Sequence, residues 1–162
     1  MEIAALPISD EAFALFGELV AHRGVDARRY LRDVPEGAAP AANLRMWVSR
    51  YPAPRPLPVV HKKLERHPHS AQTFIPLRVS RYVVVCAPAD AAGDPDAGRA
   101  RAFVVGPGTG VAYRRGVWHG PMTVLDEPAE FAVVMWSTGD AGRDDEWRDL
   151  REPIAVADAA VP

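Results

Sequence analysis

Short apolar runs, alternating or continuous, dominate the chain from residue 44 onward. Runs of this length that are bounded by proline, glycine or aspartate are typical of β-strands. The pattern predicts seven strands, at residues 44–51, 59–67, 72–77, 80–87, 101–105, 110–115 and 130–137. Seven short strands indicate an all-β fold, a sandwich or small barrel, and nothing in the pattern divides residues 1–162 into more than one domain.

The remaining segments carry weaker signals. One short helix is predicted over residues 8–17, with Ser9 or Asp10 capping its amino end. Residues 21–43 lack apolar periodicity, so we expect an irregular connection there, and residues 87–100 read as a surface loop. The tail after Trp147 is expected to pack along the outside of the domain or to stay loose.

Composition narrows the class of protein. Sixteen prolines among 162 residues favour many short elements joined by turns, because proline is excluded from helix interiors and central strands. The formal net charge of −2 gives no indication of nucleic acid or an anionic membrane as a partner. The single cysteine, Cys86, lies in an apolar run and is expected to be a buried thiol. With no apolar run of membrane-spanning length and no signal-peptide pattern, we expect a cytoplasmic protein.

The strand around residues 59–69 is unusually polar. In an extended chain, strict alternation would place His61, Glu65, His67 and His69 on one face. One interpretation is an edge strand whose charges discourage aggregation. The other is a ligand-bearing face, because imidazole and carboxylate groups are common ligands of zinc, nickel, manganese and iron.

His119, the last histidine of the chain, belongs to a second motif. Gly108, Arg114, Gly116 and His119 have the arrangement G-x5-R-x-G-x-x-H, which resembles the second signature of the cupin superfamily, with arginine where proline is typical. Glu65, His67 and Gln72 fit the spacing of the first cupin signature. The resemblance implies a jelly-roll β-barrel in which Glu65, His67, Gln72 and His119 hold a divalent metal ion inside the barrel.

At these positions the sequence also resembles one cupin family, the ureidoglycolate lyases of allantoin breakdown. The resemblance is carried by the segments "LERHPHSAQTFIPL" (64–77) and "GVAYRRGVWHGP" (110–121). It implies a cytoplasmic homodimer that splits ureidoglycolate into urea and glyoxylate with a divalent metal, usually nickel. His67 and His119 are then catalytic as well as metal-binding.

A carboxylate substrate also calls for a cation and a proton donor. Arg50, Arg114 and Arg115 are candidates for binding the substrate carboxylate, since a guanidinium can hold a carboxylate through two hydrogen bonds. Tyr113 is a candidate acid or orienting donor. For these residues the alternatives are solvated surface arginines and a half-buried strand tyrosine.

The chain departs from the family's usual pattern at residues 22–43 and 135–138. A divergent cupin that acts on, or merely binds, another small hydroxy- or amido-carboxylate therefore remains an alternative. A shared fold alone does not decide between them.

Overall fold

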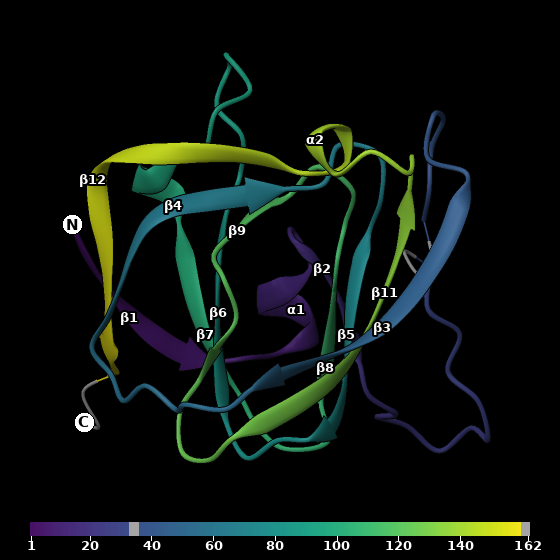
Figure 1. The fold of residues 1–162 in the computed structure, drawn as a ribbon. Helices are drawn as coiled ribbons and strands as arrows, with labels where there is room; N and C mark the ends of the chain where they lie inside the picture. The colour runs from purple at the N-terminus through teal and green to yellow at the C-terminus, as the bar shows by residue number, and fades with distance from the viewer. Residues whose placement is uncertain (33–35, 160–162) are drawn as a thin grey trace.

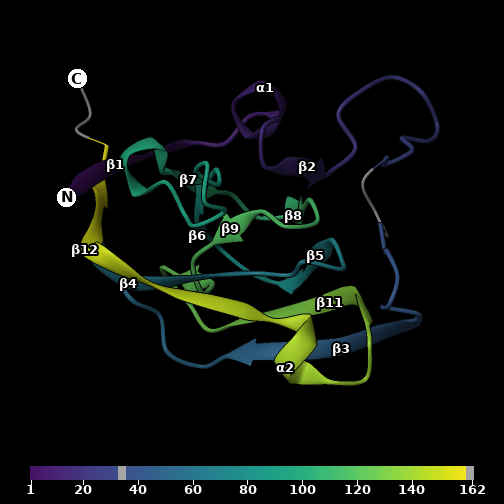
Figure 2. The same ribbon diagram turned by 90° about the horizontal axis from the view of Figure 1, so that it is seen from above.

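The computed structural model describes residues 1–32 and 36–159 and consists of two β-sheets that face each other (Figures 1 and 2). The larger sheet has the order β10-β6-β7-β1-β12-β4-β9, with a further pairing of β6 to β9 that closes it on itself. Its strands are β1 (Glu2–Pro7), β4 (Val59–Arg66), β6 (Tyr82–Ala87), β7 (Arg101–Val105), β9 (Trp118–His119), β10 (Thr123–Val124) and β12 (Glu146–Asp158). The mostly-β barrel with a short amino-terminal helix that the sequence predicts is confirmed.

The smaller sheet has the order β2-β8-β5-β11-β3, so β3 lies at its edge. Its strands are β2 (Gly17–Val20), β3 (Asn43–Tyr51), β5 (Gln72–Arg78), β8 (Gly110–Tyr113) and β11 (Ala129–Ser137). Figure 2 shows β3 alongside β11, on the side of the molecule away from α1. Among the described residues, the helical turns are α1 (Asp10–Phe13), η1 (Ala97–Arg99) and α2 (Ala141–Asp144).

Aromatic side chains fill the space between the sheets. Phe13, Phe74, Tyr82 and Phe131 belong to one buried cluster, in which ring pairs meet edge to face. The run "YVVVC" of β6 is buried along its whole length, because both faces of this strand are covered. Cys86 is buried and unpaired, as expected. This closely packed core supports the polar end of the barrel.

The chain ends are more ordered than the sequence indicates. The helix predicted over 8–17 is a single turn, α1, capped by the Ser9 side chain, and the chain enters β2 at Gly17. The tail prediction is wrong, because β12 runs inside the larger sheet, parallel to β1 and antiparallel to β4. Residues 33–35 of the predicted irregular connection lie outside the described residues. No helix among those described is long and apolar enough to cross a membrane.

Candidate metal and active site

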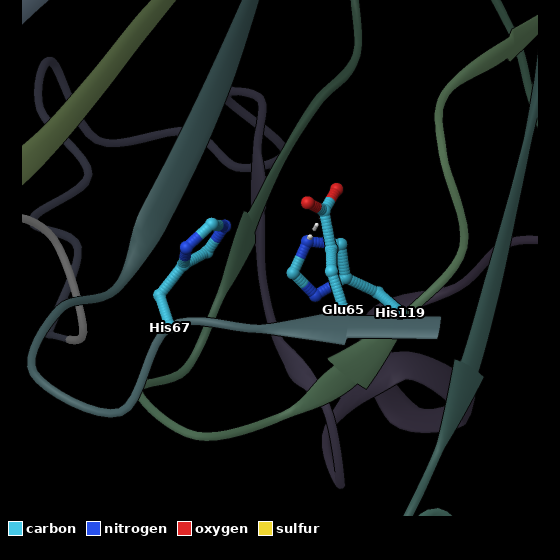
Figure 3. Close-up of side chains that lie close together, drawn as sticks. All are labelled: Glu65, His67 and His119. Atoms are coloured by element: carbon cyan, nitrogen blue, oxygen red, sulfur yellow. Dashed lines mark ion pairs between the residues drawn. The ribbon is translucent and has the colours of Figure 1, made fainter. Parts of the chain in front are cut away.

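The two motif segments meet where β4 runs beside β9. Glu65 and His119 are directly opposite each other in this antiparallel pair, and His67 follows Glu65 by two residues. The N–H of Gly116 donates to the carbonyl of His67 at 2.9 Å, which joins the second hairpin to the first. Gly116 has φ +78°, a left-handed conformation that glycine adopts without strain. Figure 3 shows the three side chains gathered at this point.

Glu65, His67 and His119 form a compact group. One ligand atom from each lies within 4.8 Å of the others. Both histidines are buried, and Glu65 is partly buried. The Nε2 atom of His119 is 3.7 Å from a carboxylate oxygen of Glu65, and the two imidazole centroids are 5.3 Å apart. Such a cluster of two imidazoles and a carboxylate can hold a metal ion.

In each histidine the two ring nitrogens, Nδ1 and Nε2, have different roles. Nδ1 of His119 lies 2.9 Å from the carbonyl of Val117, and Nδ1 of His67 lies 2.8 Å from a carboxylate oxygen of Asp145. Since a carbonyl and a carboxylate only accept hydrogen bonds, each Nδ1 carries the proton and donates. Each Nε2 then presents its lone pair to the shared space, and Nε2 of His67 is buried with no partner in the described chain. Metal-binding histidines are commonly oriented in this way.

Asp145, which the sequence reading missed, follows a small structured turn. The carboxylate of its neighbour Asp144 accepts hydrogen bonds from the Ser137 hydroxyl at 2.6 Å and from the Thr138 N–H at 2.7 Å. These bonds fix α2 against the end of β11 and so place Asp145 beside His67. Only the fold brings residue 145 to residue 67, so no local sequence signal marks it.

Burial and charge shift the pKa values of the three groups in different directions. Burial lowers the pKa of His119 to about 3, helped by the nearby His67, so its imidazole is neutral near pH 7. Burial also raises the pKa of Glu65, and the opposing effect of His67 is smaller. For His67, burial acts to lower the pKa, but Asp145 and Glu65 together outweigh it and raise the value.

Gln72 and Tyr113 complete the inner wall. The side-chain oxygen of Gln72 is 3.2 Å from Nε2 of His119, and its amide nitrogen is 3.9 Å from the sulfur of Met135. The ring of Tyr113 stacks on the His119 imidazole at 4.1 Å with an interplanar angle of 15°. The structure thus brings together Glu65, His67, Gln72, Tyr113 and His119, all of which the sequence singled out.

The three arginines singled out from the sequence are not brought to this group. Arg50 is exposed and lies 3.9 Å from Glu130. Arg114 donates to the carbonyl of Ala14, and Arg115 lies 3.3 Å from Glu36. A substrate-binding role for Arg50 would need its side chain on the inner face of β3, whereas it lies on the outer face.

A pocket opens beside the group, between β3, β11 and α2. Arg45 and Trp47 of β3 line one side of it, and Met135, Asp144 and Asp145 line the other. One of these residues, Asp145, contacts His67 of the group directly, and Met135 contacts the neighbouring Gln72. The pocket therefore borders the group on the side of Asp145 and His67.

A family model described as ureidoglycolate lyase matches residues 1–157. The chain belongs to the ureidoglycolate lyase family. It is 37% identical over 168 residues to a ureidoglycolate lyase of Burkholderia mallei (strain NCTC 10229), covering 96% of this chain and 93% of that protein. It is 30% identical to a ureidoglycolate lyase of Schizosaccharomyces pombe, covering 96% and 95%.

Among solved structures, RmlC from Streptococcus suis in complex with dTDP-D-xylose aligns with a TM-score of 0.45 and 14% identity. The alignment covers 61% of this chain and 46% of that one.

Proposed function

We propose that this member of the ureidoglycolate lyase family cleaves ureidoglycolate to glyoxylate and urea, a step of allantoin breakdown. The observation that carries the proposal is the group of Glu65, His67 and His119, which the fold gathers beside an open pocket in a chain that matches the family over residues 1–157. The substrate is then a small carboxylate.

The reaction is the collapse of a carbinolamide. The carbon that loses urea bears a hydroxyl, a carboxylate, a hydrogen and the urea nitrogen. Removal of the hydroxyl proton allows the carbon–oxygen double bond of glyoxylate to form while the carbon–nitrogen bond breaks. The departing nitrogen takes up one proton and leaves as urea, so no water is consumed. The site must accept a proton at one position and supply one at another.

The donor set fits a divalent metal ion. Nε2 of His67, Nε2 of His119 and the Glu65 carboxylate would hold it, with the Gln72 side-chain oxygen as a fourth, neutral ligand. Three ligand atoms converge within 4.8 Å of one another, and the buried Nε2 of His67 lacks a protein partner among the described residues. When bound, the ion supplies Lewis acidity, which lowers the pKa of a coordinated hydroxyl. The family resemblance favours nickel.

Protein groups around the ligands have separate tasks. Asp145 and the Val117 carbonyl hold the two imidazoles in the tautomer that leaves Nε2 free. The ring of Tyr113 fixes the plane of the His119 imidazole by stacking. Burial raises the pKa of the Tyr113 hydroxyl well above its ordinary value, so it stays protonated and would act as a hydrogen-bond donor that orients the substrate.

The test is product analysis with the purified protein, loaded with Ni²⁺ and given racemic ureidoglycolate. Glyoxylate and urea should form in equal amounts, with no ammonia. Chelation of the metal should stop the reaction, and return of the metal should restore it. Absence of glyoxylate from the metal-loaded protein, or ammonia in place of urea, would refute the assignment.

The resemblance also favours a cytoplasmic homodimer, and β3 is the strand we propose for its interface. Its outer face carries Leu44, Met46 and Val48, which are 53%, 67% and 60% exposed, and its edge has no neighbouring strand in the sheet. Apolar edge strands normally pair with another chain or are protected. The purified protein should sediment as a dimer and Met46→Lys as a monomer; a monomeric wild-type protein at micromolar concentration would count against this.

A further inference from the structure

A row of paired residues crosses the smaller sheet and ends at Arg45. Tyr113 of β8 is opposite Gln72 of β5, Gln72 is opposite Met135 of β11, and Met135 is opposite Arg45 of β3. Residues directly opposite each other across antiparallel strands point to the same face of the sheet. Since Gln72 reaches inward to His119, the register places Arg45 on the inner face, toward the site.

Neighbours of Arg45 on β3 agree with this orientation. Tyr51 packs edge-on against the buried ring of Phe131, so this position faces the core. Side chains alternate along a strand, and positions 45, 47, 49 and 51 therefore share the inner face. Trp47 and Ser49, joined by a hydrogen bond of 3.0 Å from the indole N–H, lie between Arg45 and Tyr51 on that face. Arg50 lies on the outer one.

Arg45 lies on the same face of the sheet as Gln72. It is two strands away from Gln72, a separation of roughly 10 Å between the backbones. Both side chains extend inward from the same row, and the pocket beside the group is lined by Arg45 itself. The same pocket is lined by Asp145, which contacts His67, so a small acid held by Arg45 would lie next to the group.

The charge of Arg45 is not neutralised by an ion pair with any described residue. The Asp144 carboxylate, which feels its positive charge, already accepts hydrogen bonds from Ser137 and Thr138. By contrast, Arg50 and Arg115 each face a glutamate. A guanidinium at a pocket wall with free donors is suited to bind a carboxylate through two parallel hydrogen bonds.

We propose that Arg45 binds the carboxylate of the substrate, a small 2-hydroxy acid anion, while the hydroxyl carbon lies at the Glu65, His67 and His119 group. This assignment rests on the proposed function for the identity of the substrate. It makes Arg45 a specificity-determining residue for anionic substrates.

The first test compares steady-state kinetics of the metal-loaded wild-type protein with Arg45→Gln, Arg45→Lys and Arg50→Gln. Loss of a charge-assisted contact should raise KM for ureidoglycolate roughly 10- to 100-fold in Arg45→Gln. Arg45→Lys should recover part of the loss, because it keeps the charge but not the paired geometry. Arg50→Gln, on the opposite face of the same strand, should match the wild type.

The second test separates charge recognition from turnover. Binding of glycolate and of its neutral analogue glycolamide is measured by calorimetry. The wild-type protein should prefer the anion, and Arg45→Gln should lose most of that preference.

The proposal is overturned if Arg45→Gln keeps a wild-type KM, if it keeps the wild-type preference for glycolate, or if the wild-type protein shows no preference. A wild-type protein that binds glycolate through Arg45 but releases no glyoxylate would instead refute the lyase assignment alone.

Discussion

Each histidine of the site is fixed through Nδ1, and for His67 the Asp144 carbonyl at 3.3 Å adds to the nearer Asp145 carboxylate. His67 depends on the side chain of Asp145, whereas His119 depends on a backbone carbonyl that substitution cannot remove. Asp145 is therefore the place where orientation of a ligand can be altered without touching the ligand itself.

Asp145→Ala should weaken metal binding by roughly 10- to 100-fold, because the His67 imidazole loses the acceptor that fixes its tautomer and angle. The affinity for Ni²⁺ can be measured by competition with a coloured chelator. Asp149→Ala, at an exposed aspartate of β12, which follows Asp145, should bind like the wild-type protein. Equal affinities in both variants would show that Asp145 does not position the site.

Tyr113→Phe keeps the ring that stacks on His119 and removes only the hydroxyl. We expect a fold unchanged by circular dichroism, a nearly constant KM, and a kcat reduced by about tenfold, the contribution of about one hydrogen bond. A kcat equal to that of the wild type would assign Tyr113 a packing role alone.

At the scale of elements, the site depends on where strands end. Glu65 lies at the end of β4, Gln72 at the start of β5 and His119 at the end of β9, so all three project from one end of the barrel. Their spacing made them visible in the sequence, since each motif spans one hairpin. The role of each arginine was harder to predict from the sequence. The face of β3 on which Arg50 or Arg45 lies is set by the register of β3 with β11.

Strict alternation also fails within β4. Between the pairs Lys63–Asp149 and His61–Ile154 the register with β12 shifts, and Lys63 is exposed while the next residue, Leu64, is fully buried. A bulge of this kind changes which side chains face inward. The single face predicted for residues 59–69 is therefore broken, and His61 lies apart from the metal group.

The turn α2 gives a pH-dependent prediction. Burial alone would raise the pKa of Asp144, but donors from Ser137 and Thr138 outweigh it and hold the pKa below its ordinary value of 3.8. A lowered pKa in the folded state adds stability that is complete above the unfolded value and is lost as pH falls through the folded one.

Asp144→Asn should therefore reduce the free energy of unfolding by about 1–2 kcal/mol near pH 7. The deficit should shrink as pH falls below about 4, where the wild-type carboxyl becomes protonated. Urea denaturation between pH 3 and 7 measures this, with the exposed Asp26→Asn as control. A deficit that stays constant with pH would contradict the assigned ionisation.

At the scale of the whole molecule, the first and last strands of the chain, β1 and β12, lie together in the larger sheet. β1 pairs in parallel with β12, and the amino terminus donates to the Glu152 carboxylate and to the carbonyl of Pro153. In Figure 1, β12 bends sharply to follow β4 and then β1. Sequence alone missed this strand, because its apolar residues are few and its partners are distant along the chain.

Ile154→Ala tests how far the barrel depends on β12. The side chain is 0% exposed and belongs to the buried cluster of this sheet, so the variant should lose about 2–5 kcal/mol of unfolding free energy. Val60→Ala, at a largely exposed position on the neighbouring β4, should lose less than about 0.5 kcal/mol. Similar losses in both variants would mean that β12 is peripheral to stability.

The most direct measurement is the rate of glyoxylate release from ureidoglycolate by Ni²⁺-loaded wild-type protein, His67→Ala and His119→Ala, each verified as folded by circular dichroism. Both variants should fall at least about 100-fold below the wild type, because each removes an inward-facing ligand atom and part of the proton-transfer site. His22→Ala, at an exposed histidine, should retain the wild-type rate. Near-normal turnover in either His67→Ala or His119→Ala would contradict a reaction centre formed where the two hairpins meet.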